Sequence, residues 1–271
     1  MYKHKERPRP IEIKSRKELA LMRAAGKIVA EILNDLQERA RPGVTTRELD
    51  ERAQKILDKY GATSPFMGYP NSQERGPKFP ASICTSVNEE IVHGIPRKKR
   101  VLKEGDLLKI DVGANYAGYI GDSAWTFPIG NVSAKAQELM HVTEESLAIG
   151  IAQVQTNKRL WDLIATIQDY VEKRGMNVVR EYQGHGVGRE MHEEPSIPNF
   201  LDEEFDKRPA NIQFKPGMTL AIEPMVVTGT WETQVLGDQW TVVTADHGLA
   251  AHYEHTVLVT DNGPEILTLW K

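Results

Sequence analysis

The chain has 271 residues, of which 40% are hydrophobic and 27% charged, so it can bury a large core as one large domain or two small ones. Its formal charge of −4 excludes a protein whose main role is to wrap nucleic acid, because that role needs a broad basic surface. The single cysteine, Cys84, excludes an internal disulfide and a multi-cysteine zinc finger, which favours a reducing compartment.

The segment 1–14 is a basic leader that contains several prolines. It is too charged for a signal peptide, and no later run approaches the ~18 apolar residues of a membrane span. We therefore expect a cytoplasmic protein without a membrane segment. A solvated tail is the favoured interpretation of the leader, with a contact to ribosomal RNA as the alternative.

Two helices are predicted after the leader. Ser15 begins a Ser-x-x-Glu capping box, and apolar residues follow at helical spacing over 22–36 until Arg41-Pro42-Gly43 ends the pattern. Thr45 begins a second capping box, and Gly61 stops this shorter helix. Its expected inward residues are Leu49, Ala53, Ile56, Leu57 and Tyr60.

The range 107–127 has the pattern of a β-hairpin, in which two apolar runs flank a four-residue loop over 115–118. This loop puts Asp111 directly opposite Asp122, where two like charges on one face are destabilising. A buried Lys or Arg could lie between them, or one carboxyl could keep its proton, but we expect no such base near either Asp in the hairpin. A hard divalent cation, which prefers oxygen ligands at this spacing, is therefore the first hypothesis.

The segments before and after the hairpin follow the same order. The first two helices lead through a long loop over 64–80, rich in Gly and Pro and of functional character, to one or two strands within 81–92. The elements expected after the hairpin are a helix capped by Ser133, a helix over 159–173, and central strands over 218–227 and 251–260. This repeated order predicts one α+β domain over 15–271 with pseudo-twofold symmetry, in which two antiparallel sheet halves face a central cleft and helices pack outside.

Two acids, Glu223 and Glu254, interrupt the apolar strands of the second half. For either acid alone, a buried salt bridge is the favoured interpretation. Together with Asp111 and Asp122 they bring a charge of about −4 into one cleft, close to the charge of two divalent cations that share a hydroxide. A nitrogen ligand is available at His185, where flanking glycines let the backbone approach a metal and a substrate, although a plain turn is the alternative.

Six motifs carry a resemblance that covers nearly the whole chain: S-V-N-E-E-I-V-H-G-I-P (86–96), K-I-D-V-G (109–113), G-D-S-A (121–124), G-H-G-V-G-R-E-M-H-E-E-P (184–195), I-E-P-M-V (222–226) and Y-E-H-T (253–256). With these motifs the chain resembles the type I methionine aminopeptidases, metallopeptidases of the pita-bread fold. The resemblance implies two divalent metal ions per chain, for which cobalt, manganese, iron and zinc are all chemically suitable. It implies that one ion is chelated by Asp111, that the other is bound by His185 and Glu223, and that both are bridged by Asp122 and Glu254.

The resemblance also implies the reaction, which is removal of the N-terminal methionine of nascent proteins when the second residue is small. A hydroxide activated by two metals would attack the first peptide bond, and Glu223 would carry a proton to the leaving amine. His192 would stabilise the oxyanion, and His93 would contact the scissile amide. The positions implied for the methionine pocket are Phe79, Cys84, Met191 and Trp240, of which Met191 stands where the family has an aromatic residue.

Two alternatives belong to other classes. A proline-specific peptidase of the same fold would use the same five ligands, but such enzymes usually carry a large extra amino-terminal domain, and here helices begin at about residue 16. A non-enzymatic binding protein on this scaffold would typically have lost ligands.

The ranges 67–78 and 197–216 look longer than in the family, which affects the rim of the cleft. We expect a monomer that makes a transient ribosome contact and binds no specific nucleic acid.

Overall fold

The structure is a computed structural model that describes residues 10–71, 76–204 and 207–270. Residues 1–9 of the predicted leader lie outside the described residues. The helices are α1 (Arg16–Arg39), α2 (Thr46–Tyr60), α3 (Ala134–Ile151) and α4 (Leu160–Glu172). None of these helices is long and apolar enough to cross a membrane.

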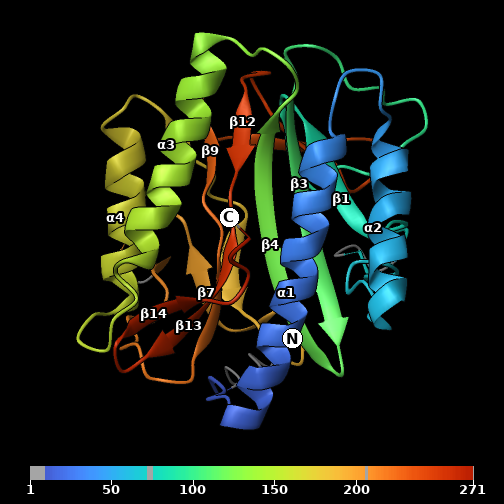
Figure 1. The fold of residues 1–271 in the computed structure, drawn as a ribbon. Coiled ribbons are helices and arrows are strands. Elements are labelled where there is room, and N and C mark those ends of the chain that lie inside the picture. The colour runs from blue at the N-terminus through green and yellow to red at the C-terminus, as the bar shows by residue number, and fades with distance from the viewer. Residues whose placement is uncertain (1–9, 72–75, 205–206, 271) are drawn as a thin grey trace, which may run out of the picture.

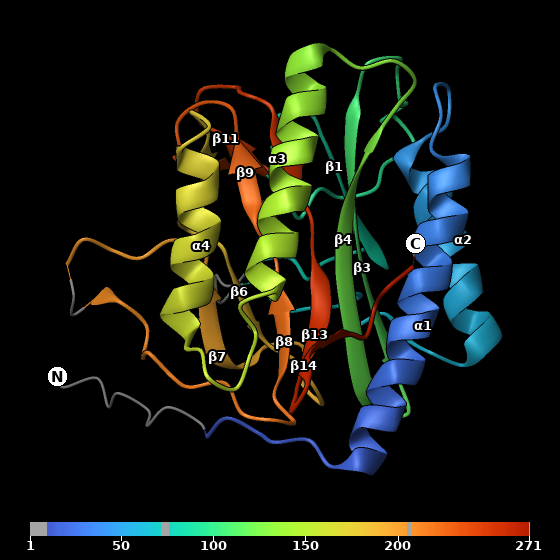
Figure 2. The same ribbon diagram turned by 60° about the vertical axis from the view of Figure 1, so that its left-hand side comes forward.

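The strands form four antiparallel sheets, and α1 and α2 pack outside one half while α3 and α4 pack outside the other (Figure 1, Figure 2). In chain order the strands are β1 (Ile83–Val87), β2 (Glu90–Val92), β3 (Leu107–Tyr116), β4 (Tyr119–Pro128), β5 (Asn177–Val178), β6 (Gln183–Gly186), β7 (Glu193–Pro198), β8 (Thr219–Ile222), β9 (Met225–Val227), β10 (Thr233–Val235), β11 (Val242–Thr244), β12 (Ala250–His252), β13 (His255–Thr260) and β14 (Gly263–Ile266). The sheets have the orders β1-β3-β4, β10-β11-β2, β12-β9-β5 and β14-β13-β8-β6-β7. The predicted α+β pita-bread architecture is confirmed.

Both N-terminal helices begin at capping boxes, as predicted. Ser15 and Thr45 each accept from the backbone N–H of the Glu three residues later, and each Glu carboxylate accepts from the cap backbone N–H in return. α2 ends at Gly61, whose φ of 63° is the left-handed conformation that glycine adopts readily. The prediction that Tyr60 faces the core is wrong. Tyr60 is 37% exposed at the end of α2, and its hydroxyl donates a hydrogen bond to Glu31 on α1.

The predicted hairpin is present, but its turn is shorter than predicted. Only Ala117 and Gly118, with φ of 51° and 83°, lie between β3 and β4, and two-residue turns with positive φ match the twist of the strands. The register therefore moves by two, so that Asp111 lies opposite Ala124 rather than Asp122. Because the shift is even, both Asp side chains stay on the same face of the hairpin.

Each predicted central strand of the second half is divided in two. Glu223 and Pro224 separate β8 from β9, and Tyr253 and Glu254 separate β12 from β13. Pro224 has no N–H to give to a ladder, and the N–H of Glu254 donates to the carbonyl oxygen of Ala124 on β4 at 2.8 Å. The chain therefore moves from one sheet to another at the two acids.

Two threonine hydroxyls hold β4 against the junction of β12 and β13. Thr256 Oγ1 accepts from the N–H of Asp122 at 3.0 Å and donates to its carbonyl oxygen at 2.8 Å. Thr126 Oγ1 makes the same two bonds with the backbone of His252, at 2.9 and 2.8 Å. Side-chain hydrogen bonds thus replace a regular ladder where the two halves meet.

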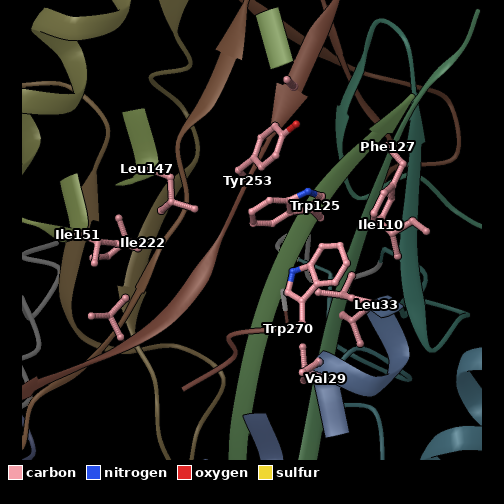
Figure 3. Packing of buried hydrophobic residues seen from close by; sticks show 14 of the residues in the cluster. Val29, Leu33, Ile110, Trp125, Phe127, Leu147, Ile151, Ile222, Tyr253 and Trp270 are labelled. Carbon is pink, nitrogen blue, oxygen red and sulfur yellow. The ribbon is translucent and has the colours of Figure 1, made fainter. Parts of the chain in front are cut away.

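The largest apolar cluster contains residues of both halves (Figure 3). The ring of Trp125 on β4 lies 4.6 Å from that of Tyr253 and 5.2 Å from that of Trp270, and each such edge-on pair stabilises the fold by about 0.5–1.5 kcal/mol beyond its buried area. The other labelled members are Val29, Leu33, Ile110, Phe127, Leu147, Ile151 and Ile222. This continuous core fixes the halves relative to each other, and the cleft lies between them.

Candidate metal centre and substrate cleft

One cavity of about 280 Å³ is lined by all eleven residues that the sequence singles out. The acids and histidines are Asp111, Asp122, Glu223, Glu254, His93, His185 and His192, and the apolar group is Phe79, Cys84, Met191 and Trp240. Four of them lie within strands, namely Cys84 on β1, Asp111 on β3, Asp122 on β4 and His185 on β6. The others lie in the segments that precede or follow strands. Segments far apart in the chain therefore converge on this cavity.

Four of the candidate ligands lie at distances that suit a shared cation. Potential ligand atoms of Asp122, His185 and Glu254 all lie within 4.8 Å of one another. His185 Nε2 is 3.8 Å from Asp122 Oδ2 and 3.6 Å from Glu223 Oε1. A divalent ion about 2.0–2.2 Å from each ligand fits between atoms 3.6 and 3.8 Å apart.

Several carboxylate oxygens in the cavity lack a hydrogen-bond partner. Asp111 Oδ1, Asp122 Oδ1 and Glu254 Oε1 are buried without a partner among the described residues. Burial raises the pKa of Asp111 to about 7 and that of Glu223 to about 8, and burial and neighbouring carboxylates raise the pKa of Asp122 and Glu254 well above their usual range. Such a set of crowded, orphaned oxygens is the donor chemistry that hard divalent cations need, so the residues fit metal.

The hairpin does hold a base, contrary to the expectation from sequence. Lys109 is 1% exposed and lies two residues before Asp111. Its Nζ donates to the carbonyl oxygens of Asn88 at 2.7 Å and Ala250 at 3.0 Å. The ammonium is therefore directed at backbone oxygens rather than at the carboxyls of Asp111 and Asp122.

His185 is oriented by its own backbone neighbourhood. Its Nδ1 lies 2.9 Å from the carbonyl oxygen of Gly186, which fixes the proton on Nδ1 and leaves Nε2 as a ligand atom. Burial lowers the pKa of His185 to about 3, so the ring is neutral at neutral pH, as a metal ligand must be.

The glycines beside His185 are required by the close packing of neighbouring strands. A Cβ on Gly184 would overlap the carbonyl oxygen of Ala221, and one on Gly186 would overlap that of Glu194. The neighbours are thus the backbones of β8 and the adjoining strand β7. Gly-His-Gly lets β6 lie closely between them while His185 enters the cavity.

His93 and His192 face the cavity from opposite halves of the chain. His93 has φ of 59°, a left-handed conformation that costs a non-glycine residue about 1–3 kcal/mol and persists where the surroundings impose it. Its ring contacts those of Tyr182 and Trp240, with centroids 5.5 and 6.3 Å away. Burial lowers the pKa of His93 to about 4, so the ring is neutral at neutral pH.

His192 has a partner that the sequence did not indicate. The hydroxyl of Tyr69 lies 2.6 Å from His192 Nδ1, and the ring of His192 is 4.3 Å from that of His185. Tyr69 belongs to the long loop 64–80, which also contributes Phe66 to the cavity. No spacing pattern relates these loop residues to the metal ligands, so only the folded chain identifies them.

The apolar end of the cavity is a compact cluster. Phe79, Cys84, Phe66 and Ala81 are buried there, with Met191 and Trp240 packed against them. The rings of Phe79 and Trp240 meet edge to face at 5.2 Å, and Trp240 Nε1 donates to the carbonyl oxygen of Pro77. The described part of 67–78 borders the cavity, whereas none of the described residues of 197–216 lines it.

Comparisons with known proteins agree with this geometry. The model of metallopeptidase family M24 matches residues 20–261. A methionine aminopeptidase of Clostridium acetobutylicum is 51% identical over 260 residues, which cover 96% of this chain and 99% of that protein. Methionine aminopeptidase 1 of Bacillus subtilis is 48% identical over 255 residues, which cover 94% and 98%.

Solved structures give the same result. The methionine aminopeptidase of Thermotoga maritima matches with a TM-score of 0.88 at 43% identity, covering 96% of this chain and 99% of that one. The prolidase of Pyrococcus furiosus matches with a TM-score of 0.75 at 22% identity and is covered over 66% of its length, which is a likeness of fold. The chain belongs to metallopeptidase family M24 and, within it, groups with the bacterial methionine aminopeptidases.

Proposed function

We propose that the chain is a methionyl aminopeptidase that removes the N-terminal methionine of polypeptides whose second residue is small. The observation that carries the proposal is a cavity in which orphaned carboxylates and His185 adjoin a compact apolar cluster. The carboxylate end offers a site for metal and a free amine, and the apolar end offers a site for an unbranched thioether side chain.

We assign the ligands as the family resemblance implies. Asp111 would chelate one ion, His185 and Glu223 the other, and Asp122 and Glu254 both. Divalent ions held by these residues would supply Lewis acidity and a water of lowered pKa. Cobalt, manganese, iron and zinc all suit carboxylate and imidazole ligands.

The remaining chemistry falls to the chain's own side chains. Glu223 would accept a proton from the attacking water and deliver it to the leaving amine. His192, held by Tyr69, would donate a hydrogen bond to the carbonyl oxygen as negative charge develops there, and His93 would contact the scissile amide. The apolar cluster would exclude water from the methionine side chain and reject charged or β-branched first residues.

The physiological substrates in this proposal are nascent polypeptides. The enzyme would act as a cytoplasmic monomer, and the basic leader would allow a transient contact with the ribosome. A single cysteine in a chain of this length supports a reducing compartment.

The test is hydrolysis of a peptide set after metals are stripped and returned one at a time. Met-Ala-Ser should be cleaved, whereas Met-Lys-Ser, Leu-Ala-Ser, Ala-Pro-Ser and N-formyl-Met-Ala-Ser should be refused, because they change the second residue, the pocket residue or the free amine. Preferred cleavage of Ala-Pro-Ser would assign the chain to proline-specific peptidases. A chain that bound no divalent ion would instead be a non-enzymatic binding protein on this scaffold.

A further inference from the structure

A second histidine, His252, faces Glu223 in addition to His185. His252 Nε2 lies 3.4 Å from Glu223 Oε2, while His185 Nε2 lies 3.6 Å from Glu223 Oε1. Each oxygen of this carboxylate therefore faces a different imidazole. His252 is 2% exposed and lines the cavity, but it belongs to none of the roles assigned above.

The backbone of His252 is held by more hydrogen bonds than that of Glu223. His252 ends β12, where it pairs with Met225 of β9, and Thr126 on β4 binds both its N–H and its carbonyl oxygen. Glu223 has less support, because it lies in the break between β8 and β9, where Asn199 Nδ2 donates to its carbonyl oxygen at 3.1 Å. An acid at a strand break thus meets an imidazole whose backbone is held by two neighbouring strands.

His252 Nε2 is buried and makes no well-aligned hydrogen bond among the described residues. A buried donor left without a partner costs roughly 1–3 kcal/mol, so the ring gains from any carboxylate that turns toward it. Asp111, Lys109 and His93 also act on His252 electrostatically, but Glu223 is the carboxylate within 4.0 Å of its Nε2.

We propose that His252 is a positioning residue for Glu223: its Nε2–H donates to Oε2 and keeps Oε1 directed toward His185 and the metal. The inference rests on the proposed function, since it concerns the same site. It requires that the ring carry a proton on Nε2, the atom that lies 3.4 Å from Glu223 Oε2. Residues that orient metal ligands in this way typically contribute about 10–100-fold to metal affinity. Each factor of ten corresponds to about 1.4 kcal/mol of binding free energy.

Three substitutions at one position separate positioning from packing. His252→Gln keeps an N–H at nearly the position of Nε2, His252→Asn keeps an amide that is too short to reach Glu223, and His252→Leu removes the donor. Each metal-free variant is titrated with Mn²⁺ by calorimetry and with Co²⁺ by visible absorption, and the thermal unfolding of each metal-free variant reports whether it folds. kcat and KM for Met-Ala-Ser are measured on the metal-loaded forms.

We expect His252→Asn and His252→Leu to bind metal roughly 10–100-fold more weakly and to lower kcat more than they raise KM, because the apolar pocket is untouched. His252→Gln should restore both the affinity and the Co²⁺ spectrum. Two results would overturn this inference and leave the proposed function intact. One is wild-type metal affinity in a folded His252→Asn protein, and the other is an equal loss of metal affinity in His252→Asn and His252→Gln. Absence of divalent-ion binding by the wild-type protein would overturn the proposed function and the inference with it.

Discussion

The two halves of the molecule present their acids in different ways. In the first half, Asp111 and Asp122 lie on β3 and β4, which pair without interruption over ten residues each. In the second half, Glu223 and Glu254 lie at breaks, where the chain leaves one sheet and joins another. The duplication therefore concerns the order of the elements and the convergence of the acids, and it does not extend to the local backbone that carries them.

This difference changes what holds each acid in place. The pleat of a continuous hairpin points both Asp side chains to one face without help from elsewhere. The acids at the breaks rely on contacts outside their own strands, such as the bond from the N–H of Glu254 to Ala124 and the bond from Asn199 to Glu223. Substitutions in the two halves should therefore separate effects on metal from effects on the fold.

The largest effect is expected at the two acids that would bridge both ions, one from each half. Asp122→Asn and Glu254→Ala should each lose metal and reduce hydrolysis of Met-Ala-Ser by more than the roughly 100-fold that outer residues of metal sites contribute. The measurements are metal content after dialysis and the initial rate. Glu138→Gln, an exposed acid on α3, is the matched control. Near-normal hydrolysis in either variant would contradict a dinuclear site.

The second prediction concerns His93, the histidine that the first half contributes to the cavity and that is not assigned as a ligand. His93→Ala should keep its metal but lower kcat by roughly 10²-fold, because a donor to the developing charge is lost. Metal content and kcat are measured on the same sample. Loss of metal in His93→Ala would mean that His93 is a ligand or supports one.

The sequence predicts the helix caps correctly, but it misleads on the length of the hairpin turn. The caps at Ser15 and Thr45 are readable because each depends on four adjacent residues. The turn at 117–118 has no Asn-Gly or Asp-Gly signal, so its length was misjudged and the hairpin register with it. The apolar run over 218–227 predicts one continuous strand, whereas Pro224, which lacks the N–H of a central strand, breaks it after Glu223.

The site shows the same division. The metal candidates could be grouped because acids within apolar strands are unusual and because the motifs are specific. His252 was missed, although it adjoins the Y-E-H-T motif, because its importance depends on where β12 meets Glu223. Tyr69 was missed because it reaches His192 from a loop, 123 positions away in the chain.

The third prediction compares how helices pack in the two halves. A Cβ on Gly26 of α1 would overlap the backbone carbonyl of Leu267, whereas one on Gly150 of α3 would lie 2.8 Å from the movable end of Ile167. Gly26→Ala should lower the free energy of unfolding by about 1–3 kcal/mol. Gly150→Ala should be nearly neutral, because Ile167 can shift and alanine favours a helix by about 1 kcal/mol over glycine. Urea unfolding of both variants tests the contrast, and a Gly26→Ala protein as stable as Gly150→Ala would refute it.

The smallest effect is expected where ion pairs join the helices of the first half. Asp35 on α1 accepts from Arg52 on α2 at 2.8 and 2.6 Å and from Arg39 on its own helix. These bonds, that of Arg52 above all, lower the pKa of Asp35 to about 2. The second half provides the control, since Asp169 on α4 forms an ion pair with Lys173, the C-cap residue of the same helix.

Asp35→Asn should lower the free energy of unfolding by about 0.2–1 kcal/mol at pH 7, since both arginines are partly exposed and screened, and Asp169→Asn should lower it less. The folded pKa lies below the usual value of 3.8, so the folded state binds fewer protons than the unfolded state between these values. The contribution of Asp35 is therefore fully present above about pH 4 and is lost as the pH falls toward about 2. Urea unfolding of the metal-free proteins from pH 7 downward measures the difference between wild type and Asp35→Asn. A difference that grows with acid, or that persists unchanged in 1 M salt, would show that Asp35 acts through something other than its charge.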